Sequence, residues 1–260
     1  DFQVKEIIIV VGYLGQQIID YVEDLKLDIK VKFVSQKKID GIANAIYLLK
    51  DELKNKKFVT ILADEYYHDA NYEEFRNKIS LNYSAITTFI KEKNPNIISK
   101  NFIGKFDKDK VLDLEEKPKN PQTDLMGVGT YFFTDKVFEY IEKTITSKLR
   151  NEKEITDVIA NMAKNTEVGF QILDTKYFNI SNRSDLISAN YTARSLNFNK
   201  KKKTLIIPAY NEEKSIKYVV EDFKDYKIFD EIIVIDNNSK DETFEISKKL
   251  NIKVVQEKKQ

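Results

Sequence analysis

The sequence predicts an α/β protein whose mixed, mainly parallel sheet is flanked by helices. Three observations lead to this prediction. Val4–Val11 is an apolar, β-branched run of the kind that parallel sheets bury on both faces. Such runs alternate three times with helical segments before residue 64, which is typical of βαβ units. A fresh alternation begins at Thr204, which indicates a second, partial Rossmann-like βαβαβ unit.

The first 64 residues alternate strands and helices. Gly12 and Gly15 turn the chain out of the first strand, Gly41 leads into the second helix, and the third strand ends on Asp64. The expected strands are Val4–Val11, Val31–Ser35 and Phe58–Ala63, and the expected helices are Gln16–Asp24 and Ile42–Lys54.

The middle of the chain is richer in strands, and no period of about 20–50 residues recurs, so the chain is not a repeat array. Thr156 is expected as an N-cap or first-turn residue, and Ser184 as the cap of a later helix. The expected strands are Ser84–Lys91, Lys110–Glu115, Thr130–Thr134 and Asp174–Ile180, and the expected helices are Asp135–Glu142, Thr156–Lys164 and Ser184–Leu196.

A polar, basic stretch at residues 197–203 divides the chain. We therefore expect a first domain at 1–196, a linker at 197–203 and the start of another domain at 204–260. Lys200–Lys203 has no interleaved aromatic residues, which favours a linker over a nucleic-acid-binding patch. In the last part, strands are expected at Thr204–Ala209, Glu231–Asp236 and Ile252–Gln256, and helices at Lys214–Phe223 and Asp241–Leu250.

The composition excludes several classes of function. The 43 basic and 42 acidic residues nearly cancel, so no overall field favours a nucleic-acid polymer or a membrane surface. No apolar run approaches the roughly 18 residues of a membrane span, and no secretory leader is visible. The absence of cysteine fits a cytoplasmic protein. With His68 as the single histidine, any metal is expected to be a hard, oxygen-liganded one.

The most informative segment is Leu114–Pro118, followed by Gly127–Phe133. It places two carboxylates and an ammonium at the end of an apolar strand, before a second strand that opens with two glycines. Carboxylates accept hydrogen bonds from hydroxyl groups, and lysine meets phosphate as a point charge. Together they suit a phosphorylated polyol, although the same residues also occur on plain surface turns.

Residues 4 to about 195 resemble the sugar-1-phosphate nucleotidylyltransferases, which convert a nucleoside triphosphate and a sugar 1-phosphate to a nucleotide sugar and pyrophosphate. The resemblance implies a Rossmann-like fold of the GT-A type, and Mg²⁺ as the cofactor. Seven short segments match in the order and at the spacing of the family: EIIIVVGYLGQQI, SQKKIDGIANAI, VTILADE, LEEKPKNP, GVGTYFF, NEKEITDVI and YFNISNRSDLISAN.

By this resemblance, Gln36 would read the nucleotide base and Gly41 would let the backbone approach the nucleotide. Asp64 would bind Mg²⁺ as a catalytic residue at the carboxyl end of a strand, where open α/β sheets bind ligands. The alternatives are a solvated glutamine at a strand end, and a turn or N-cap aspartate.

The same resemblance assigns the sugar side. Glu116 would accept the sugar hydroxyls, the catalytic Lys117 would hold the sugar phosphate, and Gly129 would keep the floor of the pocket low. Glu154 and Asp157 match a further segment of the family, but first-turn acidic residues favoured by the helix dipole explain them equally well.

Residues 204–260 resemble the opening of inverting GT-A glycosyltransferases of the dolichol-phosphate sugar synthase type. Ile206–Glu213 matches their first strand and nucleotide-contacting loop, and Ile233–Thr243 matches the second. The resemblance implies that the nucleotide part of the donor contacts Tyr210, Asn211, Glu212 and Asp236.

Two departures weaken the expected activity. No G-x-G-x-R string is present, so the family's phosphate-binding loop is not found in this sequence. The family's second magnesium ligand, an aspartate, aligns with Asn179, whose neutral amide is a weaker ligand for Mg²⁺. We therefore expect the sequence to be a segment of a longer bifunctional polypeptide. We also consider that Thr204–Phe229 completes the first sheet in place of the missing unit.

Three interpretations of function stay open. In the first, the chain is a nucleotidylyltransferase, with a nucleoside triphosphate, a sugar 1-phosphate and a nucleotide sugar as partners. In the second, it is a catalytically weakened module that binds sugar nucleotides. In the third, the glycosyltransferase part is active and the first domain is its scaffold. A homo-oligomer is compatible with all three.

Overall fold

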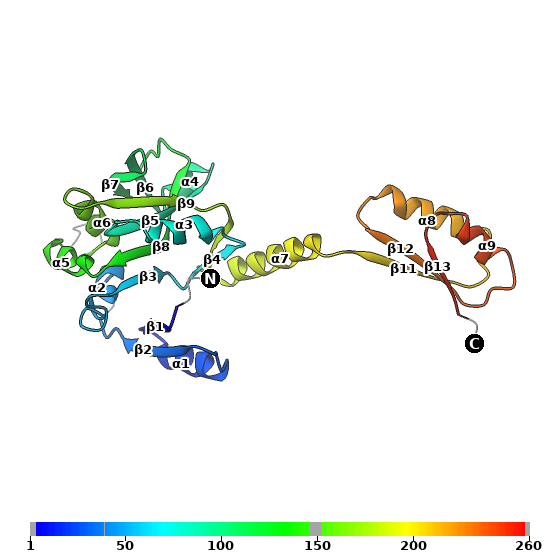
Figure 1. Ribbon diagram of the computed structural model, residues 1–260, viewed down its shortest axis with the longest axis horizontal. Coiled ribbons are helices and arrows are strands. Elements are labelled where there is room, and N and C mark those ends of the chain that lie inside the picture. Colours follow the sequence, from blue (N-terminus) through cyan, green and yellow to red (C-terminus); the bar gives the residue numbers. More distant parts are fainter. Residues whose placement is uncertain (1–3, 39, 146–151, 258–260) are drawn as a thin grey trace. The chain divides into compact units, whose positions relative to one another are not determined.

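The computed structural model describes residues 4–38, 40–145 and 152–257 and divides into two compact units, Asp1–Asp185 and Leu186–Gln260 (Figure 1). The strands of the first unit are β1 (Glu6–Val11), β2 (Lys30–Ser35), β3 (Lys57–Ile61), β4 (Glu65–His68), β5 (Ala85–Lys91), β6 (Phe102–Asp107), β7 (Lys110–Glu116), β8 (Leu125–Thr134), β9 (Val168–Ile172) and β10 (Lys176–Asn179). Its helices are α1 (Gly15–Asp24), α2 (Ile42–Tyr47), α3 (Tyr72–Ile79), α4 (Pro95–Ile98), α5 (Lys136–Lys143) and α6 (Ile155–Ala163).

The centre of the first unit is a six-stranded sheet with the strand order β3-β8-β5-β9-β7-β6, in which β8 also pairs with β6. The mixed α/β class is therefore confirmed, but this sheet is not mainly parallel, since only the β5–β9 pair is parallel. The reason is connection length: β6 and β7 are separated by residues 108 and 109, and so short a link joins only antiparallel strands.

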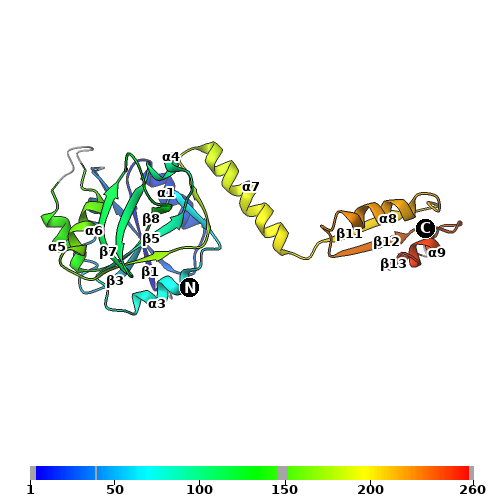
Figure 2. The ribbon, with the colours of Figure 1, turned by 90° about the horizontal axis from the view of Figure 1, so that it is seen from above.

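Helices cover both faces of this sheet. On one face, apolar side chains of α2, α5 and α6 pack against β5, β7 and β8 in the largest core cluster. Figure 2 shows α5 and α6 on the same side of β7. On the other face, Phe75 of α3 packs on Ile86 and Phe132, and Ile98 of α4 packs on Ile90 and Met126. Strand β8 is buried on both sides, which explains its nearly continuous apolar sequence.

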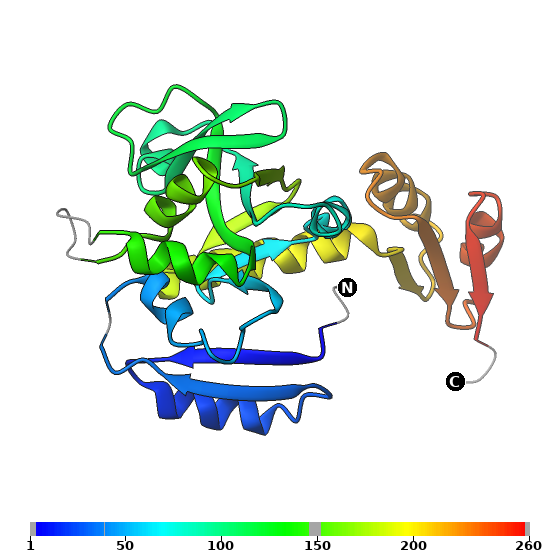
Figure 3. The ribbon, with the colours of Figure 1, turned by 60° about the vertical axis from the view of Figure 1, so that its left-hand side comes forward.

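Two short ladders stand apart from the central sheet. β1 and β2 pair in parallel, and α1 lies along one side of this pair (Figure 3). β4 and β10 pair antiparallel, with Glu65 opposite Asn179 and Tyr67 opposite Tyr177. The sequence placed β1, β2 and β3 in one parallel sheet, and this was wrong, because β3 pairs with β8.

Several local predictions need correction. The helix expected at Ile42–Lys54 ends at Tyr47. After it the N–H groups of residues 49 and 50 bond three residues back, and Asn55 takes a left-handed φ of 58°. The expectation for Thr156 is confirmed, since it lies in the first turn of α6, whose N-cap is Glu154. The cap before α7 is Asn182 rather than Ser184, since Asn182 Oδ1 accepts from the backbone N–H groups of residues 184 and 185.

The second unit contains a parallel three-stranded sheet in the order β11-β12-β13. Its apolar core joins Ala209, Val234 and Ile216. In this sheet β11 pairs with β12, and the hypothesis that residues 204–229 complete the first sheet stays a prediction. The elements are α7 (Arg183–Lys200), β11 (Thr204–Ala209), α8 (Ile216–Asp225), β12 (Glu231–Asp236), α9 (Thr243–Lys248) and β13 (Lys253–Gln256).

Helix α7 continues through residues 197–200, so part of the expected linker is helical. Among the residues that the structure describes, no helix is long and apolar enough to cross a membrane.

Candidate functional site

A bulge in β8 shapes the middle of the candidate site. The register of β5 against β8 passes from Thr87 opposite Tyr131 directly to Thr88 opposite Val128, so Gly129 and Thr130 are extra residues. The hydroxyl of Thr88 donates to the carbonyl oxygen of Thr130 at 2.8 Å and holds the bulge. Bulges of this kind locally bend a strand and are frequent beside active sites.

Gly129 lies directly beneath the turn that follows β3. A Cβ atom at this position would lie 2.4 Å from the side chain of Leu62 and 2.9 Å from Glu65 Oε2. A Cβ at this position would therefore force the Leu62 side chain or the turn to move, which glycine avoids. The role of Gly129 in the floor of a sugar pocket stays a prediction.

Glu65, which the sequence interpretation passed over, is the best-bonded carboxylate of the site. Its Oε1 accepts from the hydroxyl of Tyr177 at 2.9 Å, and its Oε2 accepts from Gly129 N at 2.8 Å and from the hydroxyl of Tyr67. Burial raises the pKa of the Glu65 carboxyl in spite of these three donors. Burial and then the charge of Glu65 also raise the pKa values of Tyr67 and Tyr177.

Asp64 and Asn179, the two expected metal ligands, lie at the same end of the β4–β10 ladder. Ile180 N donates to Asp64 O at 2.7 Å, and Asn179 is opposite Glu65 in the register. Both residues are exposed, and Asn179 Oδ1 accepts from the hydroxyl of Ser181 at 2.7 Å. The structure therefore brings the two oxygen donors to one edge.

Glu116 and Lys117 leave the end of β7 close to β8. Glu116 is opposite Phe102 of β6, and Phe102 is in turn opposite Gly127 of β8, two residues before Gly129. Glu116 Oε2 accepts from the hydroxyl of Thr156 at 3.2 Å, which attaches it to the first turn of α6.

The backbone of Lys117 is unusual for a residue with a side chain. It has a φ of 48°, and its N–H donates to Asn101 O at 2.7 Å. Left-handed backbone at a non-glycine residue is held in place by its surroundings and often marks a functional position. The Lys117 side chain is exposed and has no partner among the residues that the structure describes, so its ammonium can meet a ligand.

Gln36 and Gly41, the expected base-binding residues, also lie together. Gln36 Nε2 is 3.3 Å from Asp40 Oδ1 and 3.4 Å from Gly41 O. Gly41 has a φ of 102°, and a Cβ there would lie 2.9 Å from Lys153 O. This close approach joins the Gln36 loop to the segment that precedes α6.

Tyr131 links the two halves of the site. It is 2% exposed, and burial together with the charges of Glu65 and Glu116, and then of Tyr177 and Glu154, raises its pKa well above the ordinary value. The buried hydroxyl of Tyr131 is thus influenced by charges from both halves of the site. Burial and then the charge of Asp113 raise the pKa of Asp157, which no contact ties to the expected substrate residues.

In the second unit, Asp236 ends β12 and is fully buried. Its Oδ2 lies 3.3 Å from both Ser239 N and Gln256 Nε2, whereas its Oδ1 accepts no hydrogen bond from the described parts of the chain. A buried acceptor without a donor is rare in proteins, and a ligand is one explanation for it.

The two loops beside Asp236 are fastened to each other. Asn211 N donates to Ser239 Oγ at 3.0 Å, and Lys240 N donates to Asn211 Oδ1 at 2.8 Å. Glu212 N donates to Thr243 Oγ1 at 2.7 Å, while the side chain of Tyr210 stays exposed. Of the four residues expected to contact the nucleotide of the donor, Tyr210, Asn211 and Glu212 thus follow β11, and Asp236 ends the strand before the other loop.

Comparison with known proteins decides the family. Residues 2–195 match the profile of the Nucleotidyl transferase family. The chain belongs to the nucleotidyl transferase family. Residues 204–260 match Glycosyl transferase family 2, so both resemblances inferred from the sequence are confirmed.

Relatives of the nucleotidyl transferase part include the bifunctional protein GlmU of Methanocaldococcus jannaschii, which is 33% identical over 72% of this chain and 43% of its own length. The chain thus spans less than half of that relative. A crystal structure of a provisionally identified glucose-1-phosphate thymidylyltransferase from Bacillus anthracis has a TM-score of 0.62 and 26% identity, covering 76% of this chain and 79% of that one. The last part is 54% identical over 46 residues to the UDP-N-acetylglucosamine–dolichyl-phosphate N-acetylglucosaminyltransferase of Methanococcus voltae, which covers 18% of each chain.

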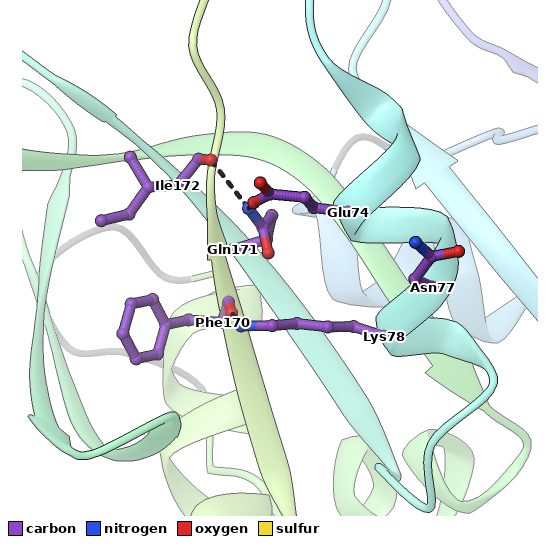
Figure 4. Close-up of a pocket in the computed structure, with 6 residues that line it drawn as sticks. All are labelled: Glu74, Asn77, Lys78, Phe170, Gln171 and Ile172. Carbon is purple, nitrogen blue, oxygen red and sulfur yellow. Dashed lines mark hydrogen bonds between the residues drawn. The ribbon is translucent and has the colours of Figure 1, made fainter.

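The first unit also has a surface cavity outside the expected site. It measures about 470 Å³ and is lined by α3 and β9, with none of the expected site residues (Figure 4). Its polar groups bond to each other: Gln171 Nε2 donates to Glu74 Oε2 at 2.7 Å, and Lys78 Nζ donates to Phe170 O at 2.7 Å. These contacts fasten α3 to the sheet and leave little for a ligand to bind.

Proposed function

We propose that residues 1–196 form a sugar-1-phosphate nucleotidylyltransferase domain, which residues 197–203 join to the start of a glycosyltransferase domain at 204–260. The limits of the two family matches, 2–195 and 204–260, support this division. The observation that carries the function is the placement of Glu116 and Lys117 at the end of β7, one strand from the glycines of β8.

In the proposed reaction an oxygen of the sugar phosphate attacks the α-phosphorus of the nucleoside triphosphate in line. A P–O bond forms there, the bond from the α-phosphorus to the bridging oxygen breaks, and pyrophosphate leaves. The Lys117 ammonium would hold the attacking phosphate, and the Glu116 carboxylate would accept the sugar hydroxyls. Gln36 and Gly41 would hold the base. Orientation and charge stabilisation account for the rate, with little acid–base chemistry.

Asp64 and Asn179 are the residues that would hold Mg²⁺. Their oxygen donors suit a hard cation, and Mg²⁺ is commonly held by one or two protein ligands together with substrate phosphates and water. Across the residues that the structure describes, no cluster of three histidine, cysteine, aspartate or glutamate side chains could hold a metal. When bound, the ion would offset the charge of the phosphates.

We further propose that the second unit belongs to a transferase that uses the nucleotide sugar as its donor and a lipid phosphate as its acceptor. The relative from Methanococcus voltae, by its name, uses UDP-N-acetylglucosamine and dolichyl phosphate, and supports a UDP-N-acetylhexosamine as the donor. The buried, unpartnered Oδ1 of Asp236 favours a donor group on the nucleotide part. The product of the first domain would then be the substrate of the second.

The test uses the full-length polypeptide that carries this sequence, with each nucleoside triphosphate, sugar 1-phosphates and Mg²⁺, and measures pyrophosphate release. Formation of a nucleotide sugar is expected. A protein that releases no pyrophosphate but is stabilised by nucleotide sugars on heating supports the binding module instead. Replacing Asn179 by aspartate separates these cases, since restored turnover identifies a weakened enzyme. If no ligand raises the melting temperature, the enzyme and the binding module both fail.

Because the substrates are nucleoside triphosphates and the chain has no cysteine, we also place this activity in the cytoplasm. Fractionation of cells that produce the full-length polypeptide, followed by the pyrophosphate assay on each fraction, tests this location.

A further inference from the structure

We propose that Glu65 is a positioning residue for nucleotidylyl transfer, fixing the turn that carries Asp64 onto the β8 bulge at Gly129. This inference rests on the proposed function of the first unit and adds a residue to it. It follows from the contacts of the Leu62–Glu65 turn, which is attached to Gly129 on two sides.

The first attachment runs through the backbone. Leu62 N donates to Gly129 O at 3.0 Å, which extends the β3–β8 pairing by one residue. The second runs through the side chain, because Gly129 N donates to Glu65 Oε2 at 2.8 Å. The N–H and the carbonyl oxygen of Gly129 therefore both bond to this turn. Asp64 lies between the two attachments, and its own carbonyl oxygen is held by Ile180 N at 2.7 Å.

The same carboxylate joins three elements. Gly129 belongs to β8, Tyr67 to β4 and Tyr177 to β10, and each of the three donates to Glu65. A carboxylate can accept from several donors through its two oxygens, whereas an amide of this size has one acceptor oxygen and an apolar side chain has none. The turn with Asp64, strand β10 with Asn179 and strand β8 with Gly129 are thereby all attached to the Glu65 carboxylate.

Packing alone would not call for a carboxylate at this position. Taking a charged group out of water is costly, and apolar residues of similar volume often stabilise a core as well or better. This cost arises at the turn that carries Asp64. Displacement of a reacting group by about 1 Å can lower a rate by about a hundredfold. The geometry thus links Glu65 to the transfer step rather than to the fold as a whole.

The experiment compares two adjacent tyrosines of one strand in the full-length polypeptide. Tyr67→Phe removes a donor to Glu65, whereas Tyr66→Phe removes a hydroxyl whose partner is His68 Nδ1, at 2.9 Å, and leaves Glu65 untouched. Glu65→Gln keeps the volume but has a single acceptor oxygen for the three donors. The measurements are kcat and KM for the sugar 1-phosphate, the melting temperature, and the hydrogen exchange of the Gly129 amide.

For Glu65→Gln we expect kcat to fall about ten- to a hundredfold, with KM within about twofold of wild type, and the Gly129 amide to exchange faster. Tyr67→Phe should change the same quantities in the same direction, and Tyr66→Phe should change none of them. An unchanged kcat in Glu65→Gln and Tyr67→Phe overturns the inference, and so does an activity loss that disappears at a temperature where the variants are fully folded.

Failure of the proposed function gives a different result. A wild-type protein with a protected Gly129 amide but no nucleotidylyl transfer overturns the function, and with it the role of Glu65 in the reaction. Protection that is the same in Glu65→Gln and wild type shows instead that Glu65 does not hold the turn.

Discussion

Two carboxylates at strand ends, the half-buried Glu65 in the first unit and the fully buried Asp236 in the second, differ in how their oxygens are used. Both oxygens of Glu65 accept hydrogen bonds from three donors of the protein. Asp236 is more deeply buried, yet its Oδ1 accepts none from the described residues. A carboxylate saturated by its own protein supports its neighbours, whereas one with an empty acceptor keeps a place for a donor from outside.

The groups that would act on substrate differ accordingly. In the first unit they are exposed side chains: Asp64 and Asn179 lie next to Glu65, and Lys117 follows β7. In the second unit the buried carboxylate is itself the candidate contact. In the first unit, replacing an exposed side chain should lower activity without changing stability. In the second unit, binding and stability are both tested at the same buried carboxylate.

The largest effect is expected for Lys117→Ala. Its exposed ammonium has no partner in the described part of the chain, so its loss should leave the melting temperature unchanged. Loss of a cation that holds the attacking phosphate should lower kcat/KM for the sugar 1-phosphate by about a hundred- to a thousandfold. Steady-state kinetics measure this change, with Lys119→Ala as the matched control. Equal losses in the two variants would show that general positive charge suffices.

Gly129→Ala should affect stability as well as activity. The new Cβ would lie 2.4 Å from Leu62 and 2.9 Å from the Glu65 carboxylate, so the supported turn must move. We expect a loss of about 1–3 kcal/mol in the free energy of unfolding, the usual cost of overpacking. Denaturant titration measures it. Gly15→Ala, where the nearest atom lies 3.2 Å away, is the control and should change little.

Asp236→Asn is expected to separate binding from stability in the second unit. The asparagine oxygen can keep the contacts with Ser239 and Gln256. Its amino group, which is a donor, takes the place of the acceptor Oδ1. The free energy of unfolding should change by less than about 1 kcal/mol, while affinity for a UDP-sugar falls at least about tenfold. Calorimetric titration tests this, with the exposed Asp222→Asn as control. Undiminished affinity would remove Asp236 from the donor site.

Much of this arrangement follows from local sequence. Apolar, β-branched runs indicated the strands from Glu6 to Val11 and from Thr204 to Ala209, although neither strand is buried on both faces. The glycine at 129 was expected at a place with no room for a side chain, and a Cβ there would meet Leu62 and Glu65. The family order of the segments indicated that Asp64 and Asn179 belong together, and the β4–β10 ladder brings them to one edge.

Other features depend on partners distant in the sequence. The antiparallel pairing of β3 with β8 joins segments about 70 residues apart, so local pattern could not distinguish it from a parallel sheet. Glu65 was passed over because its partners Gly129 and Tyr177 lie 64 and 112 residues away. The visible hint was a second carboxylate directly after Asp64, followed by Tyr67 two positions later.

Asp241 is a third carboxylate to compare with Glu65 and Asp236, and its replacement is expected to have the smallest effect. Its burial raises the pKa of its carboxyl, but hydrogen bonds from the Thr243 hydroxyl and from backbone N–H groups, including that of Glu213, outweigh this and lower it. At Glu65 the effect of burial exceeds that of the hydrogen bonds, so the pKa of its carboxyl is raised. A lowered pKa in the folded state means that ionisation favours folding.

The contribution of Asp241 to stability should therefore be complete above the ordinary aspartate pKa of about 3.9, and should be lost as the pH falls through the lower folded value. Thermal unfolding of wild type and Asp241→Asn between about pH 6 and about pH 3 measures it. The gap between their melting temperatures should be widest at the upper end and narrow on acidification. A gap that stays constant or widens on acidification would mean that the hydrogen bonds to Asp241 do not favour its charged form, and that the loops beside Asp236 are held by their other contacts.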